Sequence, residues 1–227
     1  MFGIGKNWPP SKADGPDRHV VGTIDPRDIE AALREIGPPD SWPPAARDRH
    51  HILDEGRSLI LRNERHVDMP MRWKLPAVEA ILGRVTSLGL GESPGKIVIA
   101  LLPPGRVIKP HRDSGQYYTF HNRIHVPLVT NPDVRVTVGG ECFHMSVGHI
   151  YLFQNLRRHS VHNASSAARI HLIVDMLDPR YSEATYRLLY RVLQANVLGA
   201  ATLFRMYGQS VARRSGTRPA ASKELPM

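Results

Sequence analysis

From Gly95 to Leu177, short apolar stretches alternate with turn residues, and this pattern limits the fold more than any other feature of the chain. The stretches are KIVIALLPPG, RIHVPLVTNPD, VRVTVGGE, ECFHMSVGH, IYLFQN, HSVHNAS and RIHLIVDML. Short runs with period-two hydrophobicity, separated by Gly, Pro and Asn residues, are typical of antiparallel strands in a sandwich or barrel. We therefore expect a mainly β core over residues 95–180.

Helical patterns precede this core. In TIDPRDIEAALREIGPP, residues 23–39, Asp25 is positioned to cap a helix that ends at Gly37. Residues 75–91 carry apolar side chains at helical spacing and stop at a glycine, so they predict a second helix. Between the two, RSLILRN predicts a short strand.

The chain is thus expected to contain one β domain with helices at both ends. Its segments are a flexible arm (1–20), a flank of helices and a strand (21–94), the β core (95–180), C-terminal helices (181–212) and a flexible basic tail (213–227). The apolar side of the C-terminal helices is expected to pack outside the barrel or in a homodimer contact.

Composition narrows the classes of protein. The net charge is +9, but the basic residues are mostly scattered arginines, so nucleic acid is an unlikely main partner and acidic substrates remain open. The single cysteine fits a reducing compartment. No apolar run reaches the roughly 18–20 residues that cross a bilayer, and the first 20 residues lack a secretory signal. We expect a cytoplasmic protein without a membrane span.

The stretch KPHRDSGQYYTFHNRIHVPL, residues 109–128, carries three histidines and an HxD step. Residues two apart on a strand share a face, so His111 and Asp113 can point together into the mouth of a barrel. An imidazole and a carboxylate are two of the three ligands in the facial triad of non-haem iron oxygenases. A later strand, HSVHN, offers His159 and His162 on opposite faces. We prefer His159 as the third ligand because it opens its strand, as His111 is expected to lie near the start of its own.

Two predicted strands with similar sequences begin with an arginine, Arg123 in RIHVPLV and Arg169 in RIHLIVD. Burying an arginine inside a small barrel is costly unless it meets an anion, and its planar fork suits a carboxylate. The pattern therefore favours a site for a dicarboxylate near the metal. The alternative is that both arginines form ion pairs on the outer surface.

The remaining histidines have no partner at ligand spacing. Those expected at the surface or in loops are His50, His51, His66, His121 and His149, and those expected as ordinary strand residues are His144 and His171. His162 stays open as a residue that contacts substrate. Cys142 has no convincing basic neighbour and is expected to be a packing residue.

The order of these motifs resembles the aspartyl/asparaginyl β-hydroxylase family of 2-oxoglutarate-dependent oxygenases. The resemblance covers roughly residues 97–178: an HxD step, RIHVPL, a Gly-Gly-Glu turn, a glycine before an aromatic strand, HSVHN, and an arginine before IHLIVD. It implies a double-stranded β-helix, a jelly-roll of the cupin-like type. It also implies Fe(II) as the metal, 2-oxoglutarate as co-substrate and molecular oxygen as a reactant.

The resemblance also implies roles for single residues. His111 and His159 match the two histidine iron ligands, and Asp113 stands where many members keep a carboxylate ligand. Arg169 matches the arginine that binds the far carboxylate of 2-oxoglutarate. Two further residues, Arg123 and His125, match a pair that contacts the co-substrate. One departure from the family is that Ala100 replaces a serine that helps hold the co-substrate in the animal enzyme.

The function expected from these residues is hydroxylation of a C–H bond by an Fe(II)- and 2-oxoglutarate-dependent dioxygenase. The resemblance points to the β-carbon of an Asp or Asn residue in a peptide or protein. Two alternatives stay open. One is a hydroxylase of a free amino acid, as in the proline hydroxylases, or of a small peptide natural product. The other is a non-catalytic β-barrel binding module that holds a carboxylate ligand.

Overall fold

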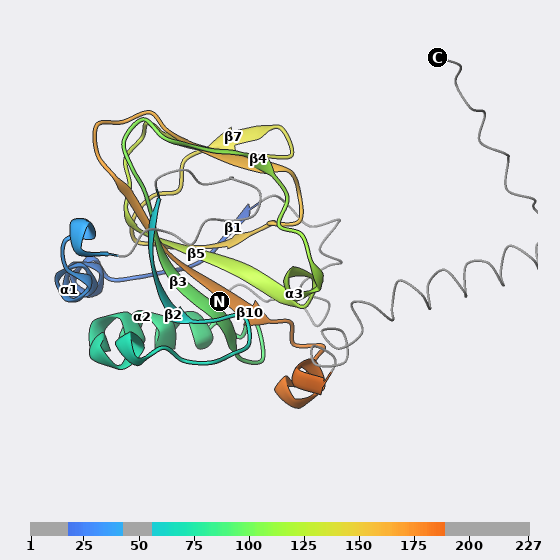
Figure 1. The fold of residues 1–227 in the computed structure, drawn as a ribbon. Helices are drawn as coiled ribbons and strands as arrows, with labels where there is room; N and C mark the ends of the chain where they lie inside the picture. The colour runs from blue at the N-terminus through green and yellow to red at the C-terminus, as the bar shows by residue number, and fades with distance from the viewer. Residues whose placement is uncertain (1–17, 43–55, 189–227) are drawn as a thin grey trace, which may run out of the picture. The chain divides into compact units, whose positions relative to one another are not determined.

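The computed structural model describes residues 18–42 and 56–188, and its strands form two antiparallel sheets (Figure 1). The chain divides into units of residues 1–183 and 184–227, and every element below lies in the first. The strands are β1 Arg18–Thr23, β2 Arg57–Arg62, β3 Pro94–Leu102, β4 Val107–His111, β5 His121–Val129, β6 Val134–Val138, β7 Glu141–Phe143, β8 His149–Phe153, β9 His159–Asn163 and β10 Arg169–Leu177. The helices are α1 Pro26–Ile36, α2 Pro76–Thr86 and α3 Gln116–Thr119, with short 3₁₀ turns at Pro39–Ser41 and Pro70–Lys74.

The larger sheet has the strand order β1-β8-β5-β10-β3-β2, and the smaller sheet has the order β4-β9-β6-β7. Each expected apolar stretch of residues 95–180 lies on a strand, and both predicted helices form, so the mainly β fold with flanking helices is confirmed. The large sheet also takes in β1 and β2 from the N-terminal flank. These strands pair with β8 and β3, which would otherwise be the exposed edges of that sheet.

Helices α1 and α2 cover the face of the large sheet that is turned away from the small sheet (Figure 1). Both helices present apolar residues at helical spacing, for example Val78, Ile81 and Val85 of α2. These side chains join the outward-facing side chains of β3, β5 and β10 in one core. A second, smaller core lies between the two sheets and includes Val136 and Phe153.

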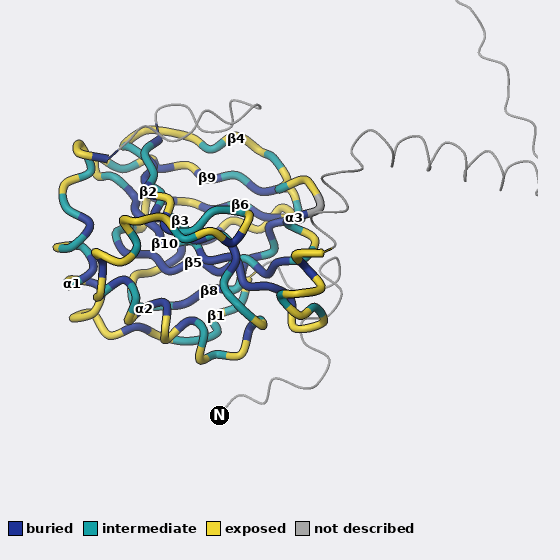
Figure 2. The backbone as a smooth tube through the Cα atoms, turned by 60° about the horizontal axis from the view of Figure 1, so that its bottom comes forward, coloured by how far each residue is buried: buried dark blue, intermediate teal, exposed yellow. Residues whose placement is uncertain are grey.

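The central strands β5 and β10 are buried along nearly their whole length (Figure 2). Their alternate residues, such as Ile124 and Leu172, belong to the core under the helices. The intervening residues therefore face the space between the sheets. The polar residues of these strands on that inner face include Arg123, His125, Arg169, His171 and Asp175.

Two expectations about histidines are wrong. His66 and His121 are not surface residues, because they are only 5% and 1% exposed. Their Nε2 atoms lie 3.0 Å apart, and the His121 Nδ1 atom lies 2.8 Å from the Tyr117 carbonyl oxygen. Gly95 makes room for this cluster, since a Cβ there would lie 2.6 Å from His121 Cδ2. The pairing joins residues far apart in sequence, which no local spacing reveals.

The packing role expected for Cys142 is also wrong, because its side chain is exposed. The residue lies on β7, the edge strand of the small sheet. Residues 18–20, the end of the expected arm, lie on β1. The expectations for residues 1–17 of the arm, for His50 and His51, for the helices beyond residue 188, for a dimer and for the basic tail lie outside the described residues. No helix of the described part is long and apolar enough to span a membrane.

Glu35 of α1 fixes the start of α2. The backbone N–H of Ala77 donates to both carboxylate oxygens at 2.9 and 2.8 Å, and that of Val78 donates at 3.3 Å. A carboxylate at a helix N-terminus meets both unpaired N–H groups and the positive end of the helix dipole. The two helices are thereby held together over the large sheet.

We predict that Glu35→Ala lowers the free energy of unfolding by about 1–3 kcal/mol, because it leaves the first N–H groups of α2 without this partner. Glu30→Ala, an exposed position on the same helix, is the matched control and should change stability by less than about 0.5 kcal/mol. Urea unfolding curves measure both. Equal effects of the two substitutions would contradict the capping role.

Candidate metal centre

His111 and His159 face each other across the pairing of β4 with β9. His111 is the last residue of β4, His159 is the first residue of β9, and the antiparallel register places them directly opposite. Their ring centroids are 4.2 Å apart. The position expected for His111, near the start of its strand, is therefore wrong. An antiparallel pair brings the end of one strand beside the start of the other.

Each imidazole is oriented by a backbone carbonyl. The Nδ1 atom of His111 lies 2.8 Å from the carbonyl oxygen of Lys109, and that of His159 lies 2.8 Å from the carbonyl oxygen of Arg157. A carbonyl can only accept, so Nδ1 carries the proton in both rings and Nε2 keeps its lone pair. Such carbonyl contacts are typical of histidines that bind a metal through the other nitrogen.

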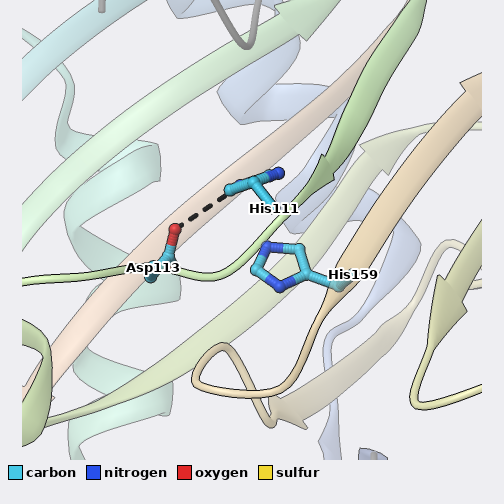
Figure 3. A group of neighbouring side chains, drawn as sticks. All are labelled: His111, Asp113 and His159. Carbon is cyan, nitrogen blue, oxygen red and sulfur yellow. Dashed lines mark ion pairs between the residues drawn. The ribbon is translucent and has the colours of Figure 1, made fainter. Parts of the chain in front are cut away.

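Asp113 follows β4 and completes the group (Figure 3). Its backbone N–H donates to the Asn155 carbonyl at 3.1 Å. The Oδ2 atom accepts from Asn155 Nδ2 at 3.0 Å and from Arg123 Nη1 at 2.5 Å. The Oδ1 atom lies 3.6 Å from His111 Nε2. One carboxylate oxygen is thus held by the protein while the other faces the two histidines.

Burial and charge set the protonation of the group. Burial opposes the charge on Asp113, but the Arg123 guanidinium outweighs it and holds the pKa of this carboxyl well below its usual range. Burial lowers the pKa of His159, which keeps that ring neutral. Burial also opposes a charge on His111, yet Asp113 and the Lys109 carbonyl raise its pKa. The centre therefore offers an ionised carboxylate and attracts a positive charge beside it.

The donor set fits a divalent metal. One ligand atom from each of His111, Asp113 and His159 lies within 4.8 Å of the other two. Two imidazoles and one carboxylate are the ligands that non-haem Fe(II) takes in a facial triad. His162, the alternative to His159, is exposed on the opposite face of β9. The structure thus brings together the three residues that the sequence predicts as a metal site.

A second polar cluster lies on the inner face of the large sheet. Arg169 is 3% exposed, and no carboxylate among the described residues pairs with it. Burial alone lowers the pKa of Arg169 to about 9, which shows how poorly its charge is compensated. Its Nη2 atom lies 2.6 Å from His171 Nδ1. The alternative of surface ion pairs for Arg169 is therefore wrong.

The protonation of this cluster follows from its donors. Because a guanidinium can only donate, His171 Nδ1 accepts and its proton sits on Nε2. His125 Nδ1 lies 3.3 Å from the same atom, so it can only donate. Three buried atoms then have no partner within the described part of the chain: Arg169 Nε, His171 Nε2 and His125 Nε2. Unmet buried polar groups are costly, and the two donors among them, Arg169 Nε and His171 Nε2, suit an anionic ligand.

Phe153 links the two clusters. Its ring centroid lies 5.1 Å from that of His159 and 5.0 Å from that of His125. The metal ligands and the Arg169 cluster therefore share one interior.

Ala100, the departure from the family motif, pairs with His171 across β3 and β10, and Ser58 of β2 pairs with Ala100.

Arg123 has different contacts from those expected. Its Nε and Nη2 atoms donate to Asp175 at 2.8 and 2.9 Å, while Nη1 donates to Asp113. Contact of Arg123 and His125 with a co-substrate stays a prediction. The sequence reasoning missed Asp175, although its spacing from Arg169 places it on the same face of β10. It also missed Asn155, which lies in a turn without any periodic signal.

Comparison with known proteins agrees with this architecture. Residues 29–179 match the family model described as aspartyl/asparaginyl beta-hydroxylase. No curated protein sequence matches the chain.

Among solved structures, a Pseudomonas putida prolyl-4-hydroxylase superimposes with a TM-score of 0.52 at 14% identity, covering 71% of this chain and 91% of its own. A prolyl hydroxylase from Trichoplax adhaerens, in complex with a hypoxia inducible factor oxygen degradation domain peptide fragment, gives a TM-score of 0.55 at 11% identity, covering 71% and 84%. These similarities confirm the double-stranded β-helix. Since the family model matches well over half of the sequence, the chain belongs to the aspartyl/asparaginyl β-hydroxylase family of oxygenases.

Proposed function

We propose that this protein is an Fe(II)- and 2-oxoglutarate-dependent dioxygenase that hydroxylates the β-carbon of an aspartyl or asparaginyl residue in a peptide or protein. The observation that carries the proposal is the buried guanidinium of Arg169, which pairs with no carboxylate among residues 18–42 and 56–188 and lies inside the same barrel as the three-residue metal centre. A barrel that only needed stability would not bury this charge without a partner.

The residues fit both the ferrous iron and the 2-oxoglutarate that the family implies. His111, Asp113 and His159 would hold ferrous iron through two nitrogens and one oxygen. The unmet N–H groups of Arg169 and His171 would bind the far carboxylate of 2-oxoglutarate, since charge-assisted hydrogen bonds to a guanidinium are strong. His125 Nε2 offers an acceptor in the same cluster, available to a water or a hydroxyl.

When bound, iron with 2-oxoglutarate and oxygen supplies the oxidation, in which decarboxylation of the keto acid to succinate is coupled to hydroxylation of the substrate. The chain contributes orientation and electrostatics. His111, Asp113 and His159 would supply three ligands to the metal, which leaves it able to take further small-molecule ligands. Arg169 anchors one end of the co-substrate, and the apolar side chains between the sheets exclude water from the interior.

The metal centre also favours an enzyme over a binding module. A module that only held a carboxylate would need Arg169, but it would not need two imidazoles with free Nε2 atoms beside an ionised Asp113. The family match supports an Asp or Asn side chain as the substrate class. A free amino acid or a small peptide is the alternative substrate that product analysis must separate.

The proposal predicts that the protein converts 2-oxoglutarate to succinate only when Fe(II) and oxygen are present. Aspartyl and asparaginyl peptides should stimulate this conversion and gain one oxygen atom, detected by mass spectrometry and located by fragmentation at the β-carbon. Free proline and free aspartate are the comparison substrates. A product from the free amino acids alone would refute the peptide assignment, and no succinate under any condition would refute the enzyme.

His159→Ala should abolish iron binding and turnover, because it removes a ligand whose Nε2 faces Asp113. The control is His162→Ala on the same strand, whose exposed side chain points away. It should leave both properties within a factor of about two, as expected for a surface change. For both variants, anaerobic calorimetric titration with Fe(II) measures iron binding, and a succinate assay measures turnover. Full activity in His159→Ala would show that His159 is not the third metal ligand.

Arg169→Ala should raise the 2-oxoglutarate concentration required for turnover at least about 30-fold, since losing a buried charged partner costs about 2–5 kcal/mol. Arg135→Ala, which changes an exposed arginine of β6, should not alter this requirement. Steady-state kinetics with varied 2-oxoglutarate provide the test. An unchanged requirement in Arg169→Ala would exclude the carboxylate-binding role.

A further inference from the structure

Asp175 is a buried carboxylate that the proposed chemistry does not use. It lies on β10, is 1% exposed, and pairs directly across the large sheet with Arg123 of β5. Burying a carboxylate is costly unless it is fully paired. Here Arg123 pairs it through two parallel hydrogen bonds from Nε and Nη2, at 2.8 and 2.9 Å.

This pairing uses one edge of the guanidinium and leaves Nη1 for Asp113. The Nη1 atom donates to Asp113 Oδ2 at 2.5 Å, and Asn155 Nδ2 donates to the same oxygen at 3.0 Å. Oδ2 is thus fully engaged, while Oδ1 is directed toward His111 Nε2 at 3.6 Å. Tyr118 lies against the guanidinium, with its ring centroid 4.9 Å from Arg123 Cζ.

We infer that Asp175 is a positioning residue for the metal centre: by fixing Arg123 edge-on, it limits Arg123 to one oxygen of Asp113 and leaves the other oxygen to bind the metal. The inference rests on the metal site of the proposed function.

The physical reason is the geometry of arginine. A free guanidinium next to a carboxylate prefers to bind both oxygens through two parallel N–H groups. If Asp175 did not occupy Nε and Nη2, Arg123 could turn and engage both Asp113 oxygens. A metal would then have to compete with a buried cation for Oδ1. Asp175 removes this competition without touching the metal.

The test is a double-mutant cycle on metal affinity. Co(II) is the probe, since it accepts the same nitrogen and oxygen ligands as Fe(II) without being oxidised in the assay, and its absorption spectrum reports the ligand set. Asp175→Asn keeps the size of the side chain but removes the charge. It should weaken Co(II) binding roughly 10–100-fold, as residues that orient metal ligands typically do. In an Asp113→Ala background the same substitution should have no further effect, because the ligand it acts through is gone.

The matched control is Asp178→Asn. Asp178 is also buried and is also held by an arginine through two hydrogen bonds, but its partner is Arg180 and not a residue of the metal centre. Melting curves of the metal-free proteins measure the structural cost of each substitution. The control should lower the melting temperature without changing Co(II) affinity.

Should Asp175→Asn fail to fold, Asp175→Glu is the second variant. It keeps the negative charge but displaces the carboxylate by one methylene, so Arg123 is no longer held in the same orientation. It should therefore also weaken Co(II) binding and lose that effect in the Asp113→Ala background.

Two results would overturn the role of Asp175 alone. In the first, the wild-type protein binds Co(II) tightly and Asp175→Asn binds it equally tightly. If Asp175→Asn then lost affinity for 2-oxoglutarate instead, the result would indicate direct contact of Arg123 with the co-substrate. The second is equal weakening with and without Asp113, which would indicate a through-space charge effect. A wild-type protein that binds no Co(II) would overturn both this role and the proposed function.

Discussion

The pairing of β4 with β9 is the contact on which the metal centre depends, because it places His111 and His159 opposite each other. A shift of one residue in this pairing would turn one imidazole to solvent. The exposed His162 on the same strand shows where that side chain would lie. β9 is held on its other side by β6, where Val138 pairs with His159, so the register is fixed from both neighbours.

The fold can accept a polar interior because most of its apolar burial lies elsewhere. The large core forms between the outer face of the large sheet and helices α1 and α2, and it stabilises β5 and β10 from one side. The inner face of the same strands is then available for charged residues such as Arg123, Arg169 and Asp175. Asp175 compensates Arg123, whereas Arg169 keeps its charge uncompensated. The uncompensated charge is the one that a bound dianion would neutralise.

Period-two alternation in the sequence is sufficient to predict the strands and the mainly β fold. It leaves the position of Arg169 open, and the cost of burying an arginine together with the nearby histidines favours the inward position. The HxD step and the later histidine indicate the metal ligands only together with the two arginines and the resemblance to the family. What alternation cannot supply is the cross-strand partner of a residue. Arg123 meets Asp175 only through the register of β5 against β10, which contains an irregularity. His66 and His121 meet through a turn and a strand start that are 55 residues apart, and Asn155 reaches Asp113 from a turn without a pattern.

An anaerobic crystal structure with ferrous iron and 2-oxoglutarate tests the central claim most directly. The account predicts one iron bound by His111 Nε2, Asp113 Oδ1 and His159 Nε2, with the far carboxylate of 2-oxoglutarate against Arg169 and His171. Iron bound to other residues, or a barrel interior in which Arg169 faces no carboxylate at saturating 2-oxoglutarate, would contradict it.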